Sequence, residues 1–390
     1  MTAARSKSAF GWAALILWLG ILLATLFPFR FRLRNDVSWM PGAQPGISVS
    51  GGLLFGRHGV VESNGPVLPQ TPSGDDSSCS IEVLLKPASY TGSSTILAFS
   101  SNGHPWRMGL RQYHDGLILW NEWPPGTNRY RYTKKDILHV FNSGQTILLT
   151  LSSSSGAKGT TAYLNGRLLQ RLPGYSLSRR AMSAQLTLGS DPVHMDTWSG
   201  EFRGLALFNR ELSSDEVADE YQNWTSSTAG HWKNISGRMA LFTFQEGQGT
   251  RVQDLCAGGP DLAIPAFFRL PLKPFLAPPW KEFSPTWDYV NDVLRNVVGF
   301  IPLGFALCGW LSLRGKTRHA ILIAVVLGAL TSLGIEILQG FLPQRESGIT
   351  DVLTNTLGTI IGAYLIHWEP IARYLGFEAC ATVLSRSLLK

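Results

Sequence analysis

The feature of this sequence that most restricts its fold is a stretch without any charged side chain, residues 10–29. A helix needs about 20 apolar residues to cross the hydrocarbon core of a bilayer, and this stretch has that length. It ends in Phe27, Pro28 and Phe29 rather than in the small residues of a signal-peptide cleavage site. We therefore expect an uncleaved membrane anchor within residues 1–34.

Three further apolar segments lie close together near the C-terminus, at residues 290–313, 320–342 and 349–368. Each is long enough to span a bilayer. The polar connections between them are too short to cover three buried helices in water. We predict a membrane region of three helices over residues 289–368, so that about four helices cross in total. A proline-rich linker at 266–288 precedes this region, and an interfacial tail at 369–390 follows it.

Charge agrees with a membrane protein and indicates its orientation. Charged residues make up 16% of the chain, against about 25% in ordinary soluble domains. The net charge of +7 contains no block of like charges, which argues against a nucleic-acid partner. Basic residues in the 314–318 connection predict that this side is cytoplasmic, which places the middle of the chain outside the cytoplasm. Arg30, Arg32 and Arg34 directly after the first span oppose this orientation.

The middle segment, residues 35–265, has a different pattern. Short β-type runs such as 80–85, 95–99 and 146–151 are separated by turn-rich stretches. Many short strands at near-regular spacing are typical of an antiparallel β-sandwich. One helical piece is expected at 213–224, where Ser-Ser-Asp-Glu forms a capping-box pattern. The sequence therefore predicts a β-sandwich domain inserted into an α-helical membrane protein.

Part of this segment resembles a known family. Tyr163, Asn165 and Gly166 form a "YxNG" hairpin, and the stretches 186–192 and 204–221 complete a pattern similar to LamG domains, which are concanavalin A-like jelly rolls. The resemblance implies either a sugar-binding module or a glucanase. A retaining glycosidase needs two carboxyl groups about 5–5.5 Å apart, usually on one strand, and no such strand motif is present. We therefore expect a binding or structural module rather than a hydrolase.

Four tryptophans are candidates for stacking on sugar rings, because a flat apolar ring complements the CH face of a pyranose. They are Trp106, Trp120, Trp123 and Trp198. The alternative for each is a place in the hydrophobic core.

Two cysteines, Cys79 and Cys256, fall in the segment expected outside the cytoplasm, where a disulfide can persist. They are a candidate disulfide pair. No CxxC pair and no Cys/His cluster is present, so neither a metal ion nor a cofactor is predicted.

Polar side chains inside the C-terminal spans are costly in a membrane and mark function by default. The chain direction places all of them in one leaflet, where we predict a polar pocket whose arginines pair with carboxylates. The candidate binding residues are Asp292, Arg295, Asn296, Glu336, Gln339, Arg345, Asp351 and Asn355.

These residues resemble the pattern of VanZ-like proteins. That pattern is "D...N...FIPLG" (292–304), "E..Q" (336–339) and "R.....DV..NT.G" (345–358). The resemblance implies an integral protein of the bacterial cytoplasmic membrane with a cell-envelope role, and the family name is associated with glycopeptide antibiotic resistance. Many members carry a further acidic residue between the Arg and the Asp. Here Glu346 is close to that position, but Gly348 and Thr350 are not acidic, so this departure from the family pattern gives no support to metal or cation binding.

Three interpretations follow. In the first, a non-enzymatic envelope protein binds a glycan or a protein with its extracytoplasmic jelly roll, and its polar pocket holds the head group of a lipid or cell-wall precursor. In the second, an intramembrane enzyme acts on lipid-linked saccharides or phosphates. Glu336 or Asp351 would then be the acid or base, while Arg295 and Arg345 hold a phosphate. In the third, the polar groups only join the helices.

Overall fold

A computed structural model describes residues 3–41, 51–68, 78–102, 104–122, 132–141, 144–226, 235–256, 258–315 and 319–371. The chain divides into two compact units. The β unit is Arg32–Lys273, and the helical unit combines Met1–Phe31 with Pro274–Lys390. The β unit is thus an insertion between the first helix and the remaining helices of the helical unit.

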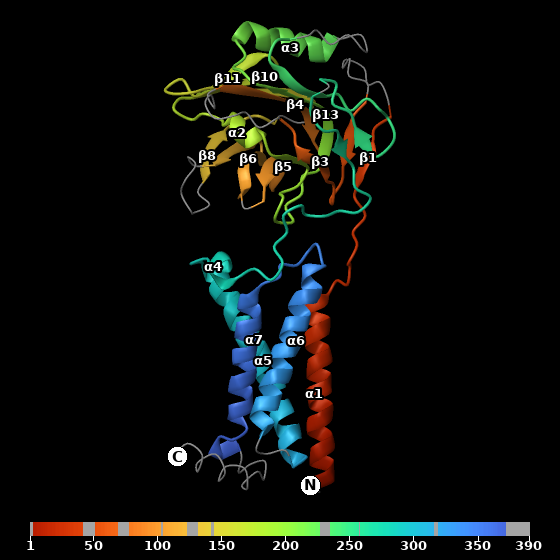
Figure 1. Cartoon of the computed structure of the whole chain (residues 1–390), viewed down its shortest axis with the longest axis vertical. Helices are drawn as coiled ribbons and strands as arrows, with labels where there is room; N and C mark the ends of the chain where they lie inside the picture. The colour runs from red at the N-terminus through yellow and green to blue at the C-terminus, as the bar shows by residue number, and fades with distance from the viewer. Residues whose placement is uncertain are drawn as a thin grey trace. The chain divides into compact units, whose positions relative to one another are not determined.

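The β unit is a sandwich of two antiparallel sheets (Figure 1). The first sheet runs in the order β1 (Val37–Trp39), β2 (Leu53–Phe55), β13 (Gly200–Phe208), β4 (Ser78–Pro87), β9 (Ile147–Ser154), β10 (Thr160–Leu164) and β11 (Arg167–Leu172), and β14 (Arg238–Phe242) pairs with β13. The second sheet runs β15 (Arg251–Val252), β16 (Leu262–Ala263), β3 (Val61–Pro66), β12 (Gln185–Leu188), β5 (Ser93–Ser101), β6 (His104–Tyr113), β7 (Gly116–Glu122) and β8 (Tyr132–Ile137). The predicted antiparallel sandwich is confirmed.

Side-chain alternation along the strands places one apolar face of each sheet in a common core. On β4, Ile81 and Val83 point into this core, whereas Leu84 belongs to a second cluster on the opposite face of the same sheet. That opposite face is covered by α3 (Ser214–Ser226), which contributes Val217 and Trp224. The predicted helical piece is present, and a short helix, α2 (Arg179–Met182), precedes β12.

The predicted disulfide is wrong. Cys79 lies in the core between the two sheets, whereas Cys256 packs against the cluster beneath α3 on the other face of the first sheet. Neither of these two cysteines forms a disulfide bond with a described residue. Because the first sheet separates the two side chains, a bond between them would require the sheet to open.

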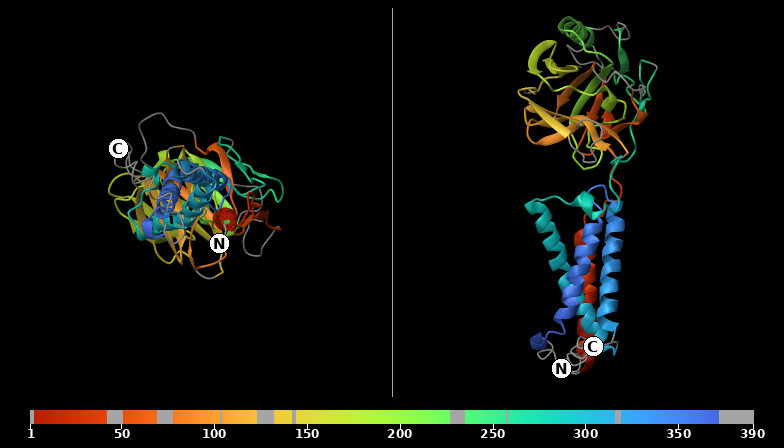
Figure 2. Two further views of the ribbon diagram at one scale, coloured as in Figure 1. Left: turned by 90° about the horizontal axis from the view of Figure 1, so that it is seen from below. Right: turned by 60° about the vertical axis from the view of Figure 1, so that its left-hand side comes forward.

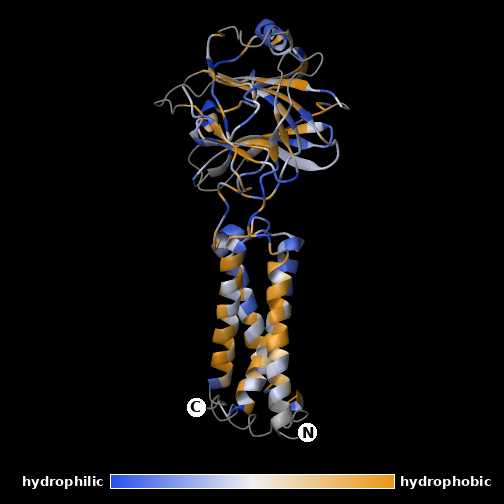
Figure 3. Cartoon of the chain, turned by 90° about the vertical axis from the view of Figure 1, so that its right-hand side faces the viewer, coloured by the Kyte–Doolittle hydropathy of each residue, from blue (hydrophilic) through white to orange (hydrophobic). Residues whose placement is uncertain are grey.

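The helical unit contains α1 (Ala3–Leu26), α4 (Pro279–Glu282), α5 (Trp287–Leu313), α6 (Ala320–Gly340) and α7 (Ile349–Leu365), arranged as a bundle in which α7 packs along α5 and α6 (Figure 2). Among the described residues, α1, α5 and α6 are long and apolar enough to cross a membrane. Their surfaces are predominantly hydrophobic, and polar positions gather toward the helix ends (Figure 3). The predicted α-helical bundle is confirmed; three of its four long helices meet this criterion, and α7, at 17 residues, is shorter.

The close packing of α7 on α5 depends on small residues. A Cβ atom at Gly358 would lie 2.1 Å from the backbone oxygen of Val297, and one at Gly362 would lie 2.0 Å from that of Ile301. Any side chain at these positions would force the two helices apart. Small residues that allow backbones to approach are typical of helix interfaces in membranes.

Candidate functional site

Polar side chains from α5, α6 and α7 meet at the end of the helical unit where α7 begins. The side-chain amide of Asn296 on α5 donates a hydrogen bond of 2.7 Å to the carboxylate of Asp351 on α7. Asn355 on α7 donates to the hydroxyl of Ser332 on α6 at 2.8 Å. The three helices are therefore joined by side-chain hydrogen bonds at this end.

Two carboxylates at this end receive backbone N–H groups instead of a cation. Glu336 is only 1% exposed and accepts the N–H of Gly348 at 2.8 Å. Glu282, on α4, accepts the N–H of Thr350 at 3.0 Å and also its hydroxyl. Thr350 lies in the first turn of α7, whose N-cap, Gly348, has no side chain to cap the helix. A carboxylate at a helix N-terminus satisfies free N–H groups and opposes the helix dipole.

Gln339 and Arg345 bind the main chain of another segment. The side-chain amide of Gln339 donates to the backbone oxygen of Thr25 at 3.1 Å, and the guanidinium of Arg345 donates to that of Phe27 at 2.8 Å. These two bonds attach the C-terminal end of α1 to the α6–α7 connection. The predicted role of Arg345 as a partner of a carboxylate is replaced by this contact with the main chain.

Arg295 and Asp292 do approach each other, with 3.8 Å between nitrogen and oxygen. Their side chains are 80% and 68% exposed, so this pair lies on the surface of the bundle rather than in its interior. The predicted arginine–carboxylate contact is therefore present, but it is exposed and does not line an interior pocket. The buried positions are held by backbone N–H groups, which are available because α7 starts there.

A second candidate site lies in the β unit, on the face of β6, β7 and β8 that points away from the core. It is a pocket of about 250 Å³. Its lining residues are Trp106, Arg111, Ile118, Trp120, Lys134, Asp191 and His194.

Strand register explains how this pocket is built. Met108 and Leu110 of β6 and Leu119 of β7 point into the core, so the alternating residues point outward. Gly109 pairs with Trp120 across the two strands, and a Cβ atom at Gly109 would lie 2.1 Å from the indole ring. The ring of Trp120 therefore lies over the glycine, flat against the sheet. Trp120 is 6% exposed, and its Nε1 has no hydrogen-bond partner in the described parts of the chain.

One wall of the pocket is held in place by Asp191. This carboxylate accepts the indole N–H of Trp106 at 3.0 Å, while its other oxygen accepts the backbone N–H groups of Val193 and His194. The rings of Trp106 and His194 are stacked, with centroids 5.6 Å apart. Both oxygens of Asp191 are thus used to fix the aromatic wall.

The rim of the pocket carries charge. The guanidinium of Arg111 lies 2.5 Å from the carboxylate of Asp196 and 2.6 Å from the hydroxyl of Ser93. Burial raises the pKa of the Asp196 carboxyl, although Arg111 opposes that shift. Lys134 of β8 stands opposite Trp120 in the register. The site thus combines an apolar aromatic floor with polar groups at its edge.

The four tryptophans proposed for sugar contact have different places. Trp106 and Trp120 line the pocket. Trp198 is fully buried, and its indole donates to Gln112 at 2.8 Å, so it belongs to the core. Trp123 lies outside the described residues. The other lining residues were missed, because the pairing of β6, β7 and β8 and the segment between β12 and β13 bring them together only in the folded chain.

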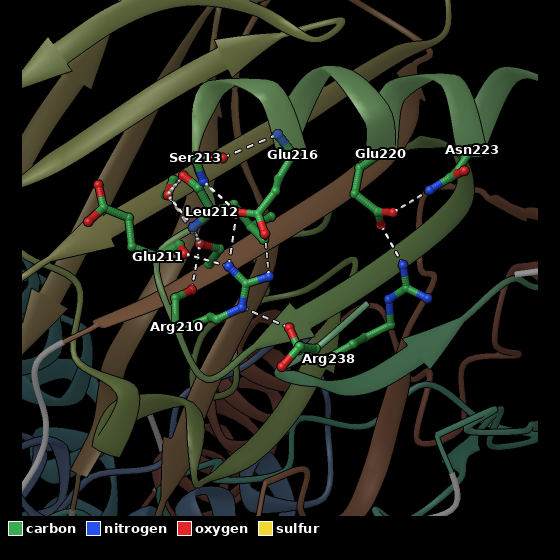
Figure 4. A network of polar contacts seen from close by, with 11 residues as sticks. Arg210, Glu211, Leu212, Ser213, Glu216, Glu220, Asn223 and Arg238 are labelled. Atoms are coloured by element: carbon green, nitrogen blue, oxygen red, sulfur yellow. Dashed lines mark hydrogen bonds and ion pairs between the residues drawn. The ribbon is translucent and has the colours of Figure 1, made fainter. Parts of the chain in front are cut away.

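Polar side chains on α3, on the segment before it and on β14 form a network of contacts in the β unit (Figure 4). Glu220 is fully buried and pairs with Arg238 at 2.6 Å, while Glu82 on β4 accepts the indole N–H of Trp224 at 3.0 Å. Burial, reinforced by the nearby Glu220, raises the pKa of Glu82 to about 8. At the exposed start of α3, hydrogen bonds from Arg210 lower the pKa of Glu216 to about 2. These contacts hold α3 on the sheet.

Within the described ranges, no group of three or more His, Cys, Asp or Glu side chains is arranged to hold a metal ion. Neither candidate site therefore carries a ligand set of that kind.

Family comparisons match both units. Residues 239–371 match the model described as VanZ/LLP1, and residues 62–218 match the concanavalin A-like lectin/glucanases superfamily. The chain combines a VanZ/LLP1 region with a concanavalin A-like domain. Both resemblances expected from the sequence are confirmed. A search of curated proteins found no match.

Solved structures similar to this chain include three with low sequence identity. A heptameric SAP-like pentraxin from Limulus polyphemus is 14% identical, with a TM-score of 0.35 over 59% of this chain and 95% of its own. The CBM40 of a Ruminococcus gnavus IT-sialidase, bound to α2,3-sialyllactose, is 16% identical, with a TM-score of 0.31 over 41% and 93%. The botulinum neurotoxin serotype D binding domain is 13% identical, with a TM-score of 0.31 over 49% and 50%.

Proposed function

We propose that this chain is a membrane-anchored glycan-binding protein of the bacterial cell envelope, and that the pocket lined by Trp106 and Trp120 holds a sugar unit. The observation that carries the proposal is the aromatic wall of the pocket, where Asp191 accepts the indole N–H of Trp106 at 3.0 Å and the ring of Trp106 stacks on His194. A ring that is fixed in this way offers a flat apolar face to the CH groups of a sugar.

The remaining chemistry of the pocket agrees with a sugar. Trp106, Ile118 and Trp120 offer apolar surface for the CH groups of a pyranose, while Arg111 and Lys134 stand at the rim where hydroxyl or carboxylate groups would lie. The volume of about 250 Å³ is below the range of about 300–1,000 Å³ for drug-sized ligands. We therefore expect recognition of one terminal or branching sugar unit rather than of a long chain.

The β unit would act outside the cytoplasm. Both of its chain connections, after α1 and before α4, join the helical unit at the end where Gln339 and Arg345 bind the C-terminal end of α1. The basic 314–318 connection belongs to the other end of α5, and basic connections favour the cytoplasmic side. This orientation would direct the pocket toward envelope glycans.

The test is glycan binding by the full-length protein in nanodiscs, measured on a glycan array and then by calorimetry with the best ligand. Trp106→Ala removes the aromatic wall, and we expect it to weaken binding about five- to tenfold. Trp280→Ala, at a 79% exposed site on α4, is the matched control and should bind normally. Wild-type protein that binds no glycan, or Trp106→Ala with unchanged affinity, would overturn the proposal. Release of reducing ends would replace it with a hydrolase.

We further propose that the polar end of the helical unit contacts the head group of a lipid or cell-wall precursor. The surface pair Asp292–Arg295 and the partly exposed Asn296–Asp351 pair offer both charges to a zwitterionic group. The enzymatic alternative has less support, because Glu336 is buried and one of its oxygens already accepts the Gly348 N–H. Asp351→Asn in the full chain should keep the fold and reduce the retention of lipid-linked precursor. Catalytic turnover of such a precursor would favour the enzyme instead.

A further inference from the structure

A groove lies in the helical unit between the N-terminal half of α1 and the C-terminal end of α5, at the opposite end of α5 from the polar cluster. It has a volume of about 480 Å³. Its lining residues are Ser8, Gly11, Trp12, Leu15, Trp310 and Arg314. The two helices are in contact here, since the rings of Phe10 and Phe305 lie 6.1 Å apart.

The groove has a charged end and an apolar end. The guanidinium carbon of Arg314 lies 4.4 Å from the centre of the Trp310 ring, so the charge is held in place by a cation–π contact. Trp12 and Leu15 on α1 are 62% and 43% exposed and continue the groove along the helix as an apolar wall. This arrangement matches the chemistry of a phospholipid, with its phosphate beside Arg314 and an acyl chain along α1.

Local sequence keeps the groove open and positively charged. A Cβ atom at Gly11 would lie 2.9 Å from the indole nitrogen of Trp310, so glycine allows the aromatic wall to approach α1. The sequence of α1 contains no acidic residue, and neither does the last turn of α5. These helix segments therefore offer no carboxylate that would compete with an anionic lipid for Arg314.

We propose that this groove is a binding site for an anionic phospholipid, selected by Arg314 and the two tryptophans. Basic pockets between membrane helices bind acidic lipid head groups, and each such charge contributes about 1 kcal/mol. The site lies on the helical unit alone and does not depend on glycan binding by the β unit. Its occupant would be a resident lipid of the membrane and not a transported or modified substrate.

The experiment is native mass spectrometry of the full-length protein purified in detergent and mixed with equal amounts of phosphatidylglycerol and phosphatidylcholine. Wild-type protein should retain phosphatidylglycerol preferentially. Arg314→Gln should reduce that preference about fivefold, since about 1 kcal/mol corresponds to that factor. Arg314→Lys should restore part of it, because the charge remains while the planar contact is lost. Arg30→Gln, an exposed arginine beyond the other end of α1, is the matched control and should retain the wild-type preference.

Three outcomes would overturn the proposal. The first is equal retention of both lipids by wild-type protein, and the second is equal behaviour of Arg314→Gln and Arg30→Gln. The third is stabilisation by inorganic phosphate alone to the same degree as by phosphatidylglycerol, which would show that the apolar wall is not used. Melting temperatures in detergent without added lipid identify a variant that has merely failed to fold, and in that case Arg314→Lys decides the result.

Discussion

In the β unit the buried carboxylate of Glu220 is neutralised by a side chain, Arg238 of β14, whereas in the helical unit the carboxylates of Glu336 and Glu282 receive backbone N–H groups at the start of α7. The donors differ because the elements differ. Glu220 lies in the middle of α3, where the backbone N–H groups are already used within the helix, so its partner is a side chain from the strand beneath. A helix N-terminus, in contrast, offers several N–H groups that have no partner within the helix. The first arrangement attaches α3 to a sheet, and the second fixes the entry of α7.

This contrast predicts that loss of Arg238, the donor to Glu220, destabilises the β unit more than loss of the Gly348–Glu336 hydrogen bond destabilises the helical unit. Arg238→Leu would leave Glu220 charged and fully buried, and breaking a buried pair in this way costs about 3–5 kcal/mol. Hydrogen exchange measured on peptides from α3 should then accelerate at least a hundredfold. The double variant Arg238→Leu with Glu220→Gln removes the stranded charge and should recover much of the protection. An Arg238→Leu protein with wild-type exchange would show that the pair does not hold α3.

Loss of the hydrogen bond between Glu336 and Gly348 in the helical unit should cost less free energy of unfolding. Glu336→Ala leaves the N–H of Gly348 buried without an acceptor, at about 1–3 kcal/mol. Glu336→Gln keeps an oxygen at the same place, so it should remain close to the wild type. Hydrogen exchange across 341–350 measures both variants. If the Gln variant is as unstable as the Ala variant, the charge of Glu336 matters and the comparison with Glu220 fails.

The stability of the β unit should also depend on pH, through one buried carboxyl group. Glu82 has its pKa raised to about 8 in the folded β unit, above the usual value of 4.5. The folded state therefore holds a proton that the unfolded chain has lost, and stability is greatest at low pH and declines as pH rises through 8. The free energy of unfolding should fall by about 1 kcal/mol between pH 7 and pH 9. Glu82→Gln, which cannot ionise, should flatten this dependence in thermal unfolding curves. A slope that persists in the variant would assign the effect to another group.

Much of this architecture can be predicted from local sequence, but several site residues cannot, because distant segments bring them together. The membrane helices were predictable because hydropathy accumulates along a continuous segment, and the joining of Asn296 and Asp351 agrees with helix spacing and chain direction. Glu282 was missed because it lies in a stretch that sequence alone presents as a proline-rich linker. A short helix starting with Pro279 at its first turn was the available signal.

The pocket of the β unit shows the same limit in a sheet. Trp106 and Trp120 were candidates because they are tryptophans. Trp198 was a candidate for the same reason, yet it lies in the core. For Trp120 the distinction depends on the face of β7 that it occupies and on Gly109 across from it, and a change of one residue in the register of β6 and β7 would reverse it. Trp106 precedes that paired stretch and is placed by its hydrogen bond to Asp191.

The smallest effect on stability is expected at Asp292 and Arg295, although the sequence suggested them as members of a costly intramembrane ion pair. Asp292 and Arg295 are both exposed, and exposed pairs contribute about 0–1 kcal/mol. Asp292→Asn should therefore change the free energy of unfolding by less than about 0.5 kcal/mol in the full-length protein. Because the variant folds normally, any loss of retained precursor lipid measured by mass spectrometry would report on recognition and not on stability. A large destabilisation would instead mean that this pair supports the bundle, and the head-group proposal would lose the residues that a ligand can reach most directly.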